Sequence, residues 1–516
     1  MQLLSHHEGV SPDKPALVFE PSGHMITYGE LSERTARLRR LLWRQGLRRG
    51  DHVAILMENH PRFLEICWAA LKSGLYITAI NRYLTPPEAG FILQDCSAAV
   101  LMTSAHMAET AAGAVAHAPG CKVRLMVDGV AEGFNSYEAA LAATSPDAAD
   151  EPVEDWAGDF MLYSSGSTGR PKGIKRPLQD CPIEDGWRLR PSQAKYGFGP
   201  KMAYLSPAPL YHSAPLSYVL GTHYFGGTAV VMERFEPADA LALIERHRIT
   251  HSQWVPTMFV RFLKMTEAER TAHDLSSHRC AVHSAAPCPV EVKRAMIEWW
   301  GPIIEEYFGA TEGNGSTSIT SAEWLERPGS VGRARAGIIH ICGEDGEDLP
   351  PGEIGQIYFE QPTLVFRYHN DDAKTASAQH PRRPTWTSVG DIGYVDDQGY
   401  LFLTDRKSFM IISGGVNIYP QAIENALVLH PKVADVAVIG VPNPDFGEEV
   451  KAIVEPAAGV AGTPELAAEL TAFLGGRIAK HTIPRSFDFM ETLPRLPTGK
   501  LSKQALKANY WPATAR

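Results

Sequence analysis

Helix-like and strand-like segments alternate along residues 27–81, and this rhythm is the strongest constraint on the fold. A helix is expected after Thr27, because Glu30 follows three residues later as in a capping box and apolar residues then recur at helical spacing. Residues 51–59 are typical of a buried strand, residues 61–75 carry a second helical pattern, and another strand-like run follows. Strands separated by helices favour a parallel sheet. The sequence therefore predicts an α/β fold with a mostly parallel sheet covered by helices.

Two later regions have a different pattern. Residues 329–360 are rich in Gly and Asp turn signals, which predicts a β-rich subdomain. A new α/β rhythm begins near residue 407, with strand-like runs at 432–442 and 450–456 and a helical pattern over 463–478. The 516 residues correspond to about three domain-sized units. We therefore expect a large N-terminal domain and a small α+β C-terminal domain.

Composition excludes several classes of protein. The formal net charge is −10 and no dense block of Lys or Arg occurs, which argues against a nucleic-acid partner. The sequence has no apolar run long enough for a transmembrane helix, and its first residues lack the pattern of a secretory signal. The seven cysteines are odd in number and form no CxxC pair, which is typical of reduced, buried thiols in a cytoplasmic protein.

The stretch "YSSGSTGRPKG", residues 163–173, has the composition of a phosphate-binding loop. An apolar strand is expected over residues 159–165, and the glycines after it permit a tight turn with exposed N–H groups. Hydroxyl side chains and Lys172 would add further donors. Pro171 stands where a P-loop needs glycine, so the stretch is not a Walker A motif. The alternative for this stretch is an ordinary solvated hairpin.

The stretch "EEYFGATEGNG", residues 305–315, places an aromatic ring, a turn and a carboxylate in sequence. Phe308 would stack on a purine, and Glu312 would hold Mg²⁺, a cation that prefers oxygen ligands. The alternative is a turn that caps a helix.

A hairpin is expected over residues 387–406, because "DDQG" is a turn signal between two strand-like runs. If Val395 pairs with Tyr400, Asp391 lies opposite Thr404, and Arg406 shares the face of Asp391. A carboxylate and a guanidinium on one face suit the vicinal hydroxyls of a ribose. The alternative is an exposed ion pair of little energetic value.

The segment 175–200 is polar and punctuated by Pro and Gly. It predicts a long surface excursion, and long ordered loops are often functional.

Eight stretches stand in the order found in one enzyme family. They cover residues 71–88, 163–173, 208–215, 284–289, 306–313, 388–406, 411–424 and 494–503. With them, the chain resembles the adenylate-forming (AMP-binding) acyl-CoA synthetase superfamily over essentially its whole length.

This resemblance implies an N-terminal AMP-binding domain over residues 1–406 and a mobile C-terminal domain over residues 407–516. It implies that a small carboxylic acid attacks MgATP to give acyl-AMP and pyrophosphate. The small domain then rotates, and the CoA thiol takes the acyl group and releases AMP. ATP, Mg²⁺ and coenzyme A are the expected cofactors and co-substrates. The oligomeric state is left open, with a homodimer as one option.

The resemblance also implies roles for residues of the nucleotide site. The phosphate loop comprises Ser164, Ser165, Gly166, Ser167, Thr168, Gly169 and Lys172. The adenine site comprises Ala286, Pro287, Glu306, Tyr307, Phe308 and Gly309. Thr311 would touch the α-phosphate, Glu312 and Thr168 would lie at the metal, and Asp391 with Arg406 would hold the ribose. Relatives carry Asn or Gln facing the adenine amino group at the position of Glu306.

The C-terminal segments carry the remaining implied roles. Lys500 would bridge the attacking carboxylate and the α-phosphate, which lowers their mutual repulsion. Ser408 occupies the hinge position, where Asp or Lys is commoner in the family. Ser413, Gly414 and Gly415 would shape the CoA channel after rotation.

The acyl pocket is implied to lie near His212, which would gate it and contact the substrate. Its expected residues are Tyr211, His212, Trp254, Met258, Ser284 and Ala285. Several are apolar, which favours a hydrophobic acid: a medium- or long-chain fatty acid, an aryl or cinnamate-like acid, or a steroid-derived acid. Alternatives are an enzyme that loads acyl-AMP onto a carrier protein in trans, a light-emitting oxygenase, and a non-catalytic adenine-nucleotide sensor. The intact set of Lys172, Glu312, Asp391 and Lys500 argues against the sensor.

Overall fold

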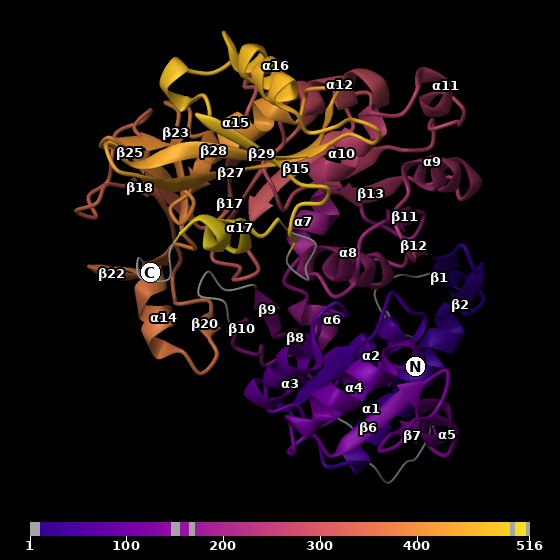
Figure 1. Ribbon diagram of the computed structural model, residues 1–516. Helices are drawn as coiled ribbons and strands as arrows, with labels where there is room; N and C mark the ends of the chain where they lie inside the picture. Colours follow the sequence, from indigo (N-terminus) through magenta and orange to yellow (C-terminus); the bar gives the residue numbers. More distant parts are fainter. Residues whose placement is uncertain (1–10, 146–154, 165–170, 496–500, 512–516) are drawn as a thin grey trace.

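The computed structural model describes residues 11–145, 155–164, 171–495 and 501–511 (Figure 1). The phosphate-loop residues Ser165, Gly166, Ser167, Thr168 and Gly169 lie outside the described residues, as does Lys500.

A six-stranded parallel sheet with helices around it is formed by the first part of the chain, as the sequence predicts. Its strands in spatial order are β7 (Asn135–Ser136), β6 (Val123–Val127), β5 (Val100–Ser104), β3 (His52–Leu56), β4 (Tyr76–Ala79) and β8 (Asp159–Phe160). Its helices are α1 (Tyr28–Arg44), α2 (Arg62–Leu71), α3 (Pro86–Asp95), α4 (Ala108–Ala116) and α5 (Tyr137–Ala142). The expected start of α1 is confirmed, because the Thr27 hydroxyl accepts a hydrogen bond from the Glu30 N–H.

A second sheet of fifteen strands forms the centre of the molecule. Its parallel part comprises β1 (Pro15–Glu20), β12 (Thr228–Met232), β11 (Ala203–Ser206), β13 (His251–Trp254), β14 (Cys280–His283) and β15 (Ile304–Gly309). Beside it pack α8 (Ser213–Tyr224), α9 (Pro237–Arg246), α10 (Pro256–Leu263), α11 (Glu267–Arg270) and α12 (Val290–Trp300). At the edge, β2 (His24–Thr27) pairs antiparallel with β1.

The large sheet becomes antiparallel after β15. This part contains β16 (Ser316–Ile319), β17 (Ser330–Ala336), β18 (Ile338–Cys342), β19 (Gly355–Glu360), β21 (Gln379–His380), β22 (Arg383–Thr387), β23 (Asp391–Val395) and β24 (Leu401–Arg406), with α13 (Ser321–Glu326) between β16 and β17. The β-rich region predicted over residues 329–360 is thus confirmed as β17, β18 and β19.

A separate five-stranded sheet forms the C-terminal part. Its strands are β25 (Ile411–Ser413), β26 (Val416–Ile418), β27 (Val433–Asn443), β28 (Gly447–Pro456) and β29 (Ser486–Phe489), and its helices are α15 (Pro420–Leu427), α16 (Pro464–Leu474) and α17 (Lys503–Tyr510). In Figure 1 the α16 end of this part is at the top, and the six-stranded sheet is at the bottom. The predicted fold class is therefore confirmed.

The apolar run over residues 159–165 divides between two sheets. Its first residues form β8, whereas β9 (Leu162–Ser164) pairs with β10 (Lys172–Lys175), which pairs in turn with β20 (Arg367–Tyr368). The single strand that the sequence predicts here is wrong, because Met161 lies between two short strands with different partners. The helix α14 (Asp372–Ala378) follows β20.

The segment 175–200 is not a surface excursion throughout. It contains two short helices, α6 (Ile183–Gly186) and α7 (Arg190–Lys195), and its apolar residues Ile183, Trp187, Tyr196 and Phe198 are buried. Glu184 forms an ion pair of 2.5 Å with the buried Lys72. The prediction followed the polar majority of the segment, whereas a few spaced apolar side chains determine its position.

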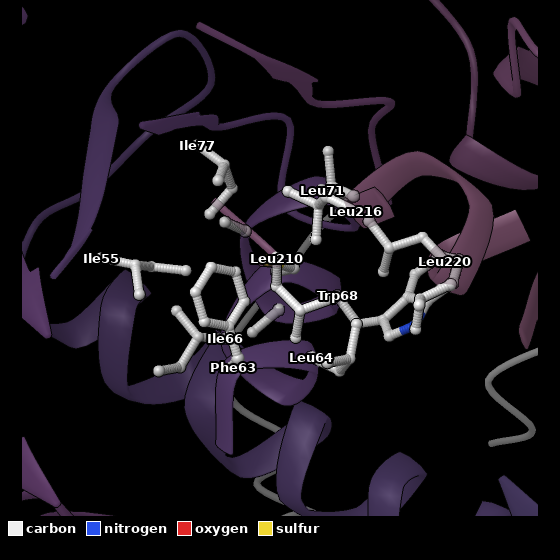
Figure 2. Close-up of a cluster of buried hydrophobic side chains, with 14 of the residues drawn as sticks. Ile55, Phe63, Leu64, Ile66, Trp68, Leu71, Ile77, Leu210, Leu216 and Leu220 are labelled. Atoms are coloured by element: carbon white, nitrogen blue, oxygen red, sulfur yellow. The ribbon is translucent and has the colours of Figure 1, made fainter. Parts of the chain in front are cut away.

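The main hydrophobic core joins the two larger sheets. Figure 2 shows Leu64 and Trp68 of α2 together with Leu216 and Leu220 of α8, so a helix of each sheet contributes to the same cluster. The Trp68 indole donates a hydrogen bond to the buried His223 ring at 3.2 Å. Because this core is shared, the two sheets hold each other in place. Among the described residues, no helix has the length and apolar character to cross a membrane.

We expect Leu64→Ala to lower the free energy of unfolding by about 2–5 kcal/mol, because it opens a cavity in the shared core. Leu64 is 0% exposed. Leu325→Ala is the matched control, since Leu325 is 43% exposed, and its effect should stay within about 0.5 kcal/mol. Urea unfolding followed by tryptophan fluorescence measures both. Equal effects of the two substitutions would contradict this assignment of the core.

Candidate active site

A cleft of ≈ 2470 Å³ lies between the large sheet and the C-terminal part. Its lining comes from the carboxyl ends of β13 and β15, from α8, from the 175–200 segment, and from α15 and α17. Carboxyl ends of parallel strands are a common place for ligand sites in α/β proteins. The cleft is therefore the candidate active site.

Two lysines meet at the phosphate side of the cleft. The pairing of β9 with β10 sets Ser164 opposite Lys172, and both residues line the cleft together with Lys374 of α14. Burial lowers the pKa of the Lys172 ammonium and the neighbouring ammonium of Lys374 lowers it further, while the carboxylates of Asp371 and Glu312 act in the opposite direction. Like charges held together repel. An anion such as a phosphate would relieve this repulsion.

The strand β15 carries the predicted purine floor. Phe308 and Gly309 line the cleft, as do Ala286 and Pro287 from the loop after β14, whereas Tyr307, which the sequence also assigns to the adenine site, stacks on Tyr218 of α8. Ala285, in the same loop, has a φ of +75°, a left-handed conformation that is rare for residues other than glycine and costs strain. Such strain is often found where a loop is shaped for a ligand.

A buried ion pair lies beneath this floor. Lys293 of α12 is fully buried, and its ammonium is 2.5 Å from Oε2 of Glu306. His283 Nε2 lies 3.5 Å from the same carboxylate oxygen. Burial raises the pKa of Glu306, and the Lys293 ammonium acts in the opposite direction. The sequence places Glu306 at the amino group of adenine, and the structure shows that one of its oxygens is already bound by Lys293.

Glu312 is the carboxylate that the sequence assigns to the metal. It is buried, lines the cleft with Thr311, and its Oε1 accepts a hydrogen bond of 2.8 Å from the Tyr368 hydroxyl. Mg²⁺ in nucleotide sites is typically held by one or two carboxylates and the phosphates themselves. No group of three or more potential metal ligands occurs among the described residues.

The hairpin of β23 and β24 brings Asp391 and Arg406 together. The predicted register is wrong: Val395 pairs with Leu401, and a bulge between Ile392 and Gly393 places Asp391 directly opposite Arg406. The strand β24 has one residue more than the simple pairing allows, and Thr404 is the residue without a partner.

The side chains of Asp391 and Arg406 are arranged in a way that suits the binding of a ligand. Arg406 Nε donates to Asp391 Oδ1 at 3.0 Å, so the predicted sharing of one face is confirmed. The other oxygen, Asp391 Oδ2, is buried and has no hydrogen-bond partner among the described residues. A buried carboxylate oxygen without a partner is costly, and a ligand hydroxyl would satisfy it.

The predicted acyl pocket lies at the start of α8. His212 is the residue before α8, and its ring lies 4.4 Å from that of Tyr211. All six expected residues line the cleft. Trp254, however, is almost wholly buried and packs edge-on against Phe235, Phe262 and Trp300, so most of its surface supports the core.

Comparison with known families and structures agrees with this geometry. The family model "AMP-binding enzyme" matches residues 4–369, and "AMP-binding enzyme C-terminal domain" matches residues 422–500. The chain belongs to the AMP-binding enzyme family. It is thus a member of the adenylate-forming acyl-CoA synthetase superfamily.

Two curated relatives and two solved structures illustrate the likeness. A feruloyl-CoA synthase of Amycolatopsis sp is 34% identical over 95% of this chain and 94% of its own length. A long-chain-fatty-acid–CoA ligase of Mycobacterium tuberculosis is 31% identical over 98% of each chain. The ATP-bound MatB from Rhodopseudomonas palustris has a TM-score of 0.81 at 28% identity over 99% of each chain. The o-succinylbenzoate CoA synthetase from Bacillus subtilis, in complex with its acyl-adenylate intermediate, has a TM-score of 0.80 at 27% identity over 96% of each chain.

Some of the C-terminal segments with predicted roles in this AMP-binding enzyme line the cleft, and one does not. Arg495 and Leu501, on either side of the segment that contains Lys500, pair in an antiparallel bridge and line the cleft. Ser408 lies in the exposed turn after β24 and also lines it. The turn at 413–415 connects β25 to β26 and is not among the described residues that line the cleft.

The sequence did not identify several residues of the site, among them Lys374, Lys293 and Tyr368. Each contacts a predicted residue from a distant part of the chain, as Tyr368 contacts Glu312. Local spacing carries no signal for such contacts. The sequence carries a signal only for the burial of Lys293, because this residue falls at helical spacing among the apolar residues on the buried face of α12.

We expect Lys293→Met to lower the free energy of unfolding by about 3–5 kcal/mol near neutral pH, because Glu306 becomes a buried charge without a partner. The pKa of Glu306, already raised by burial, would rise further. The folded chain then keeps a proton that the unfolded chain releases above about pH 4.3, so the defect should grow as pH rises above this value and shrink below it. The double variant Lys293→Met/Glu306→Gln should recover much of the loss. A defect that does not depend on pH in urea unfolding would refute the ion-pair explanation.

Proposed function

We propose that this chain joins a carboxylic acid to coenzyme A in two half-reactions driven by ATP. It is an AMP-forming acid–thiol ligase of the AMP-binding family, and its relatives act on aryl or fatty acids. One observation carries the proposal: a single cleft contains the lysine pair, Glu312, the free oxygen of Asp391 and the acyl pocket. A sensor of adenine nucleotides has no need of an acyl pocket.

In the first half-reaction the acid's carboxylate attacks the α-phosphorus of ATP, and pyrophosphate leaves. Lys172 and Lys374 would hold the departing phosphates, because two neighbouring ammonium groups attract an anion. Asp391 Oδ2 would accept hydrogen bonds from the ribose hydroxyls while Arg406 fixes the carboxylate. Phe308 would stack on adenine, and Glu306 would present its second oxygen to the amino group. Positioning of this kind aligns the two reacting groups.

Glu312 would hold Mg²⁺ together with the phosphate oxygens, with Thr168 as a second contact. The metal would neutralise phosphate charge when bound. The Tyr368 hydroxyl would orient Glu312 for this task, because it donates a hydrogen bond to Oε1 and not to Oε2.

Lys500 would bridge the attacking carboxylate and the α-phosphate. The ends of its segment, Arg495 and Leu501, already line the cleft, which supports this role. In the second half-reaction the small domain, residues 407–516, would rotate at Ser408 and bring the 413–415 turn to the site. The CoA thiol then attacks the acyl carbon, a thioester bond forms, and AMP leaves.

The direct test is to incubate the enzyme with a panel of carboxylic acids, ATP, Mg²⁺ and CoA, and to identify AMP and thioester by mass spectrometry. AMP and acyl-CoA in equal amounts are expected for at least one acid. Acyl-AMP without thioester would instead support transfer to a carrier protein. An enzyme that releases no AMP with any acid would disprove the proposal.

We expect Asp391→Ala to raise the KM for ATP about 10–100-fold, because the ribose loses hydrogen bonds to a charged, buried acceptor. Asp397→Ala is the matched control, since Asp397 is exposed in the turn of the same hairpin and does not line the cleft. The measurement is acid-dependent pyrophosphate release as a function of ATP concentration. A KM for ATP that is equal in the two variants would rule out the ribose role.

We expect Lys500→Ala to slow acyl-AMP formation about 100–1,000-fold, because charge stabilisation at the reacting centre is lost. Thioester formation from added acyl-AMP should persist, since Lys500 belongs to the first half-reaction. Lys480→Ala provides the control, as Lys480 is exposed and remote from the cleft lining. If pyrophosphate release is unchanged in Lys500→Ala, the assigned mechanism is incorrect.

A further inference from the structure

One part of the acyl pocket, here called its floor, is polar, although the apolar residues of the predicted pocket favour a hydrophobic acid. Gln253, Ser284 and Tyr307 come from β13, from the end of β14 and from β15, three neighbouring strands of the large sheet. All three residues line the cleft, and Gln253 and Ser284 are buried. Ser217 adds a further hydroxyl residue from α8, which packs against this face. A purely hydrophobic acyl group would cover these polar groups without bonding to them, which is unfavourable.

The three floor residues form a small hydrogen-bonding cluster. Gln253 Nε2 donates to Ser284 Oγ at 3.4 Å, a long bond that leaves capacity for a stronger partner. The Tyr307 hydroxyl lies beside both side chains. Burial raises the pKa of Tyr307, so the phenol stays protonated and can donate. The cluster therefore offers donors and acceptors but no net charge.

Aromatic rings form the wall next to this cluster. Tyr307 stacks on Tyr218 of α8 with ring centroids 6.1 Å apart and an interplanar angle of 16°, and Tyr218 stacks on Tyr204 at 6.2 Å. Tyr204 Oη and Ser206 Oγ behind the wall are buried without a hydrogen-bond partner in the described part of the chain. The stack joins β11, α8 and β15 through the rings of Tyr204, Tyr218 and Tyr307. A flat ring fits beside stacked aromatic rings.

Two cationic residues that line the cleft, Lys195 and Arg335, already form polar contacts with the protein. Lys195 and Arg335 both donate to Ser318 Oγ, at 3.0 and 2.8 Å, and Lys195 also lies 3.9 Å from Glu305. Both cations therefore already have polar partners outside the cluster of Gln253, Ser284 and Tyr307. A neutral hydrogen-bonding group suits the cluster better than a second carboxylate.

We propose that the acid activated by this enzyme is an aromatic acid whose ring carries a hydrogen-bonding oxygen at the end remote from its carboxyl group, and that Gln253, Ser284 and Tyr307 recognise this oxygen. The proposal rests on the proposed function and narrows its substrate class. It assigns Gln253 and Tyr307 as specificity-determining residues. The two curated relatives differ on this point, since one is named for an aryl acid and the other for fatty acids.

The test compares kcat/KM of the full-length enzyme for four acids at saturating ATP: 4-hydroxycinnamate, cinnamate, a benzene dicarboxylate and hexadecanoate. The hydroxylated acid should exceed cinnamate by at least about ten-fold, because a buried site with hydrogen-bonding groups rejects an analogue that leaves them unpaired. The kcat/KM for the benzene dicarboxylate and for hexadecanoate should be lower than that for cinnamate. Preference for hexadecanoate, for the dicarboxylate or for cinnamate would overturn the inference.

Two variants connect the preference to the cluster. Tyr307→Phe and Gln253→Leu should each reduce the ratio of 4-hydroxycinnamate to cinnamate toward one, whereas Tyr394→Phe should keep it, because Tyr394 stacks on Phe402 away from the cleft. A ratio that persists in both variants would overturn the assignment of these residues. If no acid yields AMP, the proposed function itself fails. If acids are activated without a preference for the ring oxygen, only this inference fails.

Discussion

The common edge at which β11, β13, β14 and β15 end is the constraint on which the rest of the site depends. Parallel strands that end together place loop residues side by side although they are far apart in sequence. The adenine floor and the acyl floor both come from this edge, and β15 supplies both: Phe308 to the nucleotide side and Tyr307 to the acyl side. Because successive residues of a strand point to opposite faces, Tyr307 and Phe308 project to different sides of β15.

Charged groups are paired one to one where they support the structure, and they are only partly compensated in the cleft. Lys293 with Glu306 and Lys72 with Glu184 are buried pairs in which each charge has its partner. Lys172 faces Lys374, and Asp391 keeps one oxygen free. Unpaired groups of this kind reduce stability. The proposed function assigns these groups to the phosphates and the ribose of one nucleotide.

Local patterns in the sequence predict much of this arrangement, and contacts between distant segments account for the rest. The β–α–β rhythm and the shared face of Asp391 and Arg406 follow from local spacing, whereas the roles of Phe308 and Glu312 rest on the family resemblance and stay predictions. The bulge at Thr404 does not, because an unpaired residue leaves no mark on the alternation of side chains. Tyr368 and Lys374 approach the site through β20 and α14, whose placement depends on strand pairing with β10. The buried part of the 175–200 segment was missed because Trp187 and its neighbours are a minority among polar residues. Lys500 and five residues of the phosphate loop lie outside the described residues, so their roles stay predictions.

The bulged hairpin also determines how the small domain is attached. Arg406 is the last residue of β24 and pairs with Asp391, and the exposed turn containing Ser408 begins one residue later. The bulge sets both the face on which Arg406 projects and the direction in which the chain leaves the large sheet. Insertion or deletion of a single residue in β24 would therefore misdirect the guanidinium and re-aim the entire C-terminal domain at once. The length of β24 therefore sets both the position of Arg406 at the predicted nucleotide site and the direction of the connection to the C-terminal domain.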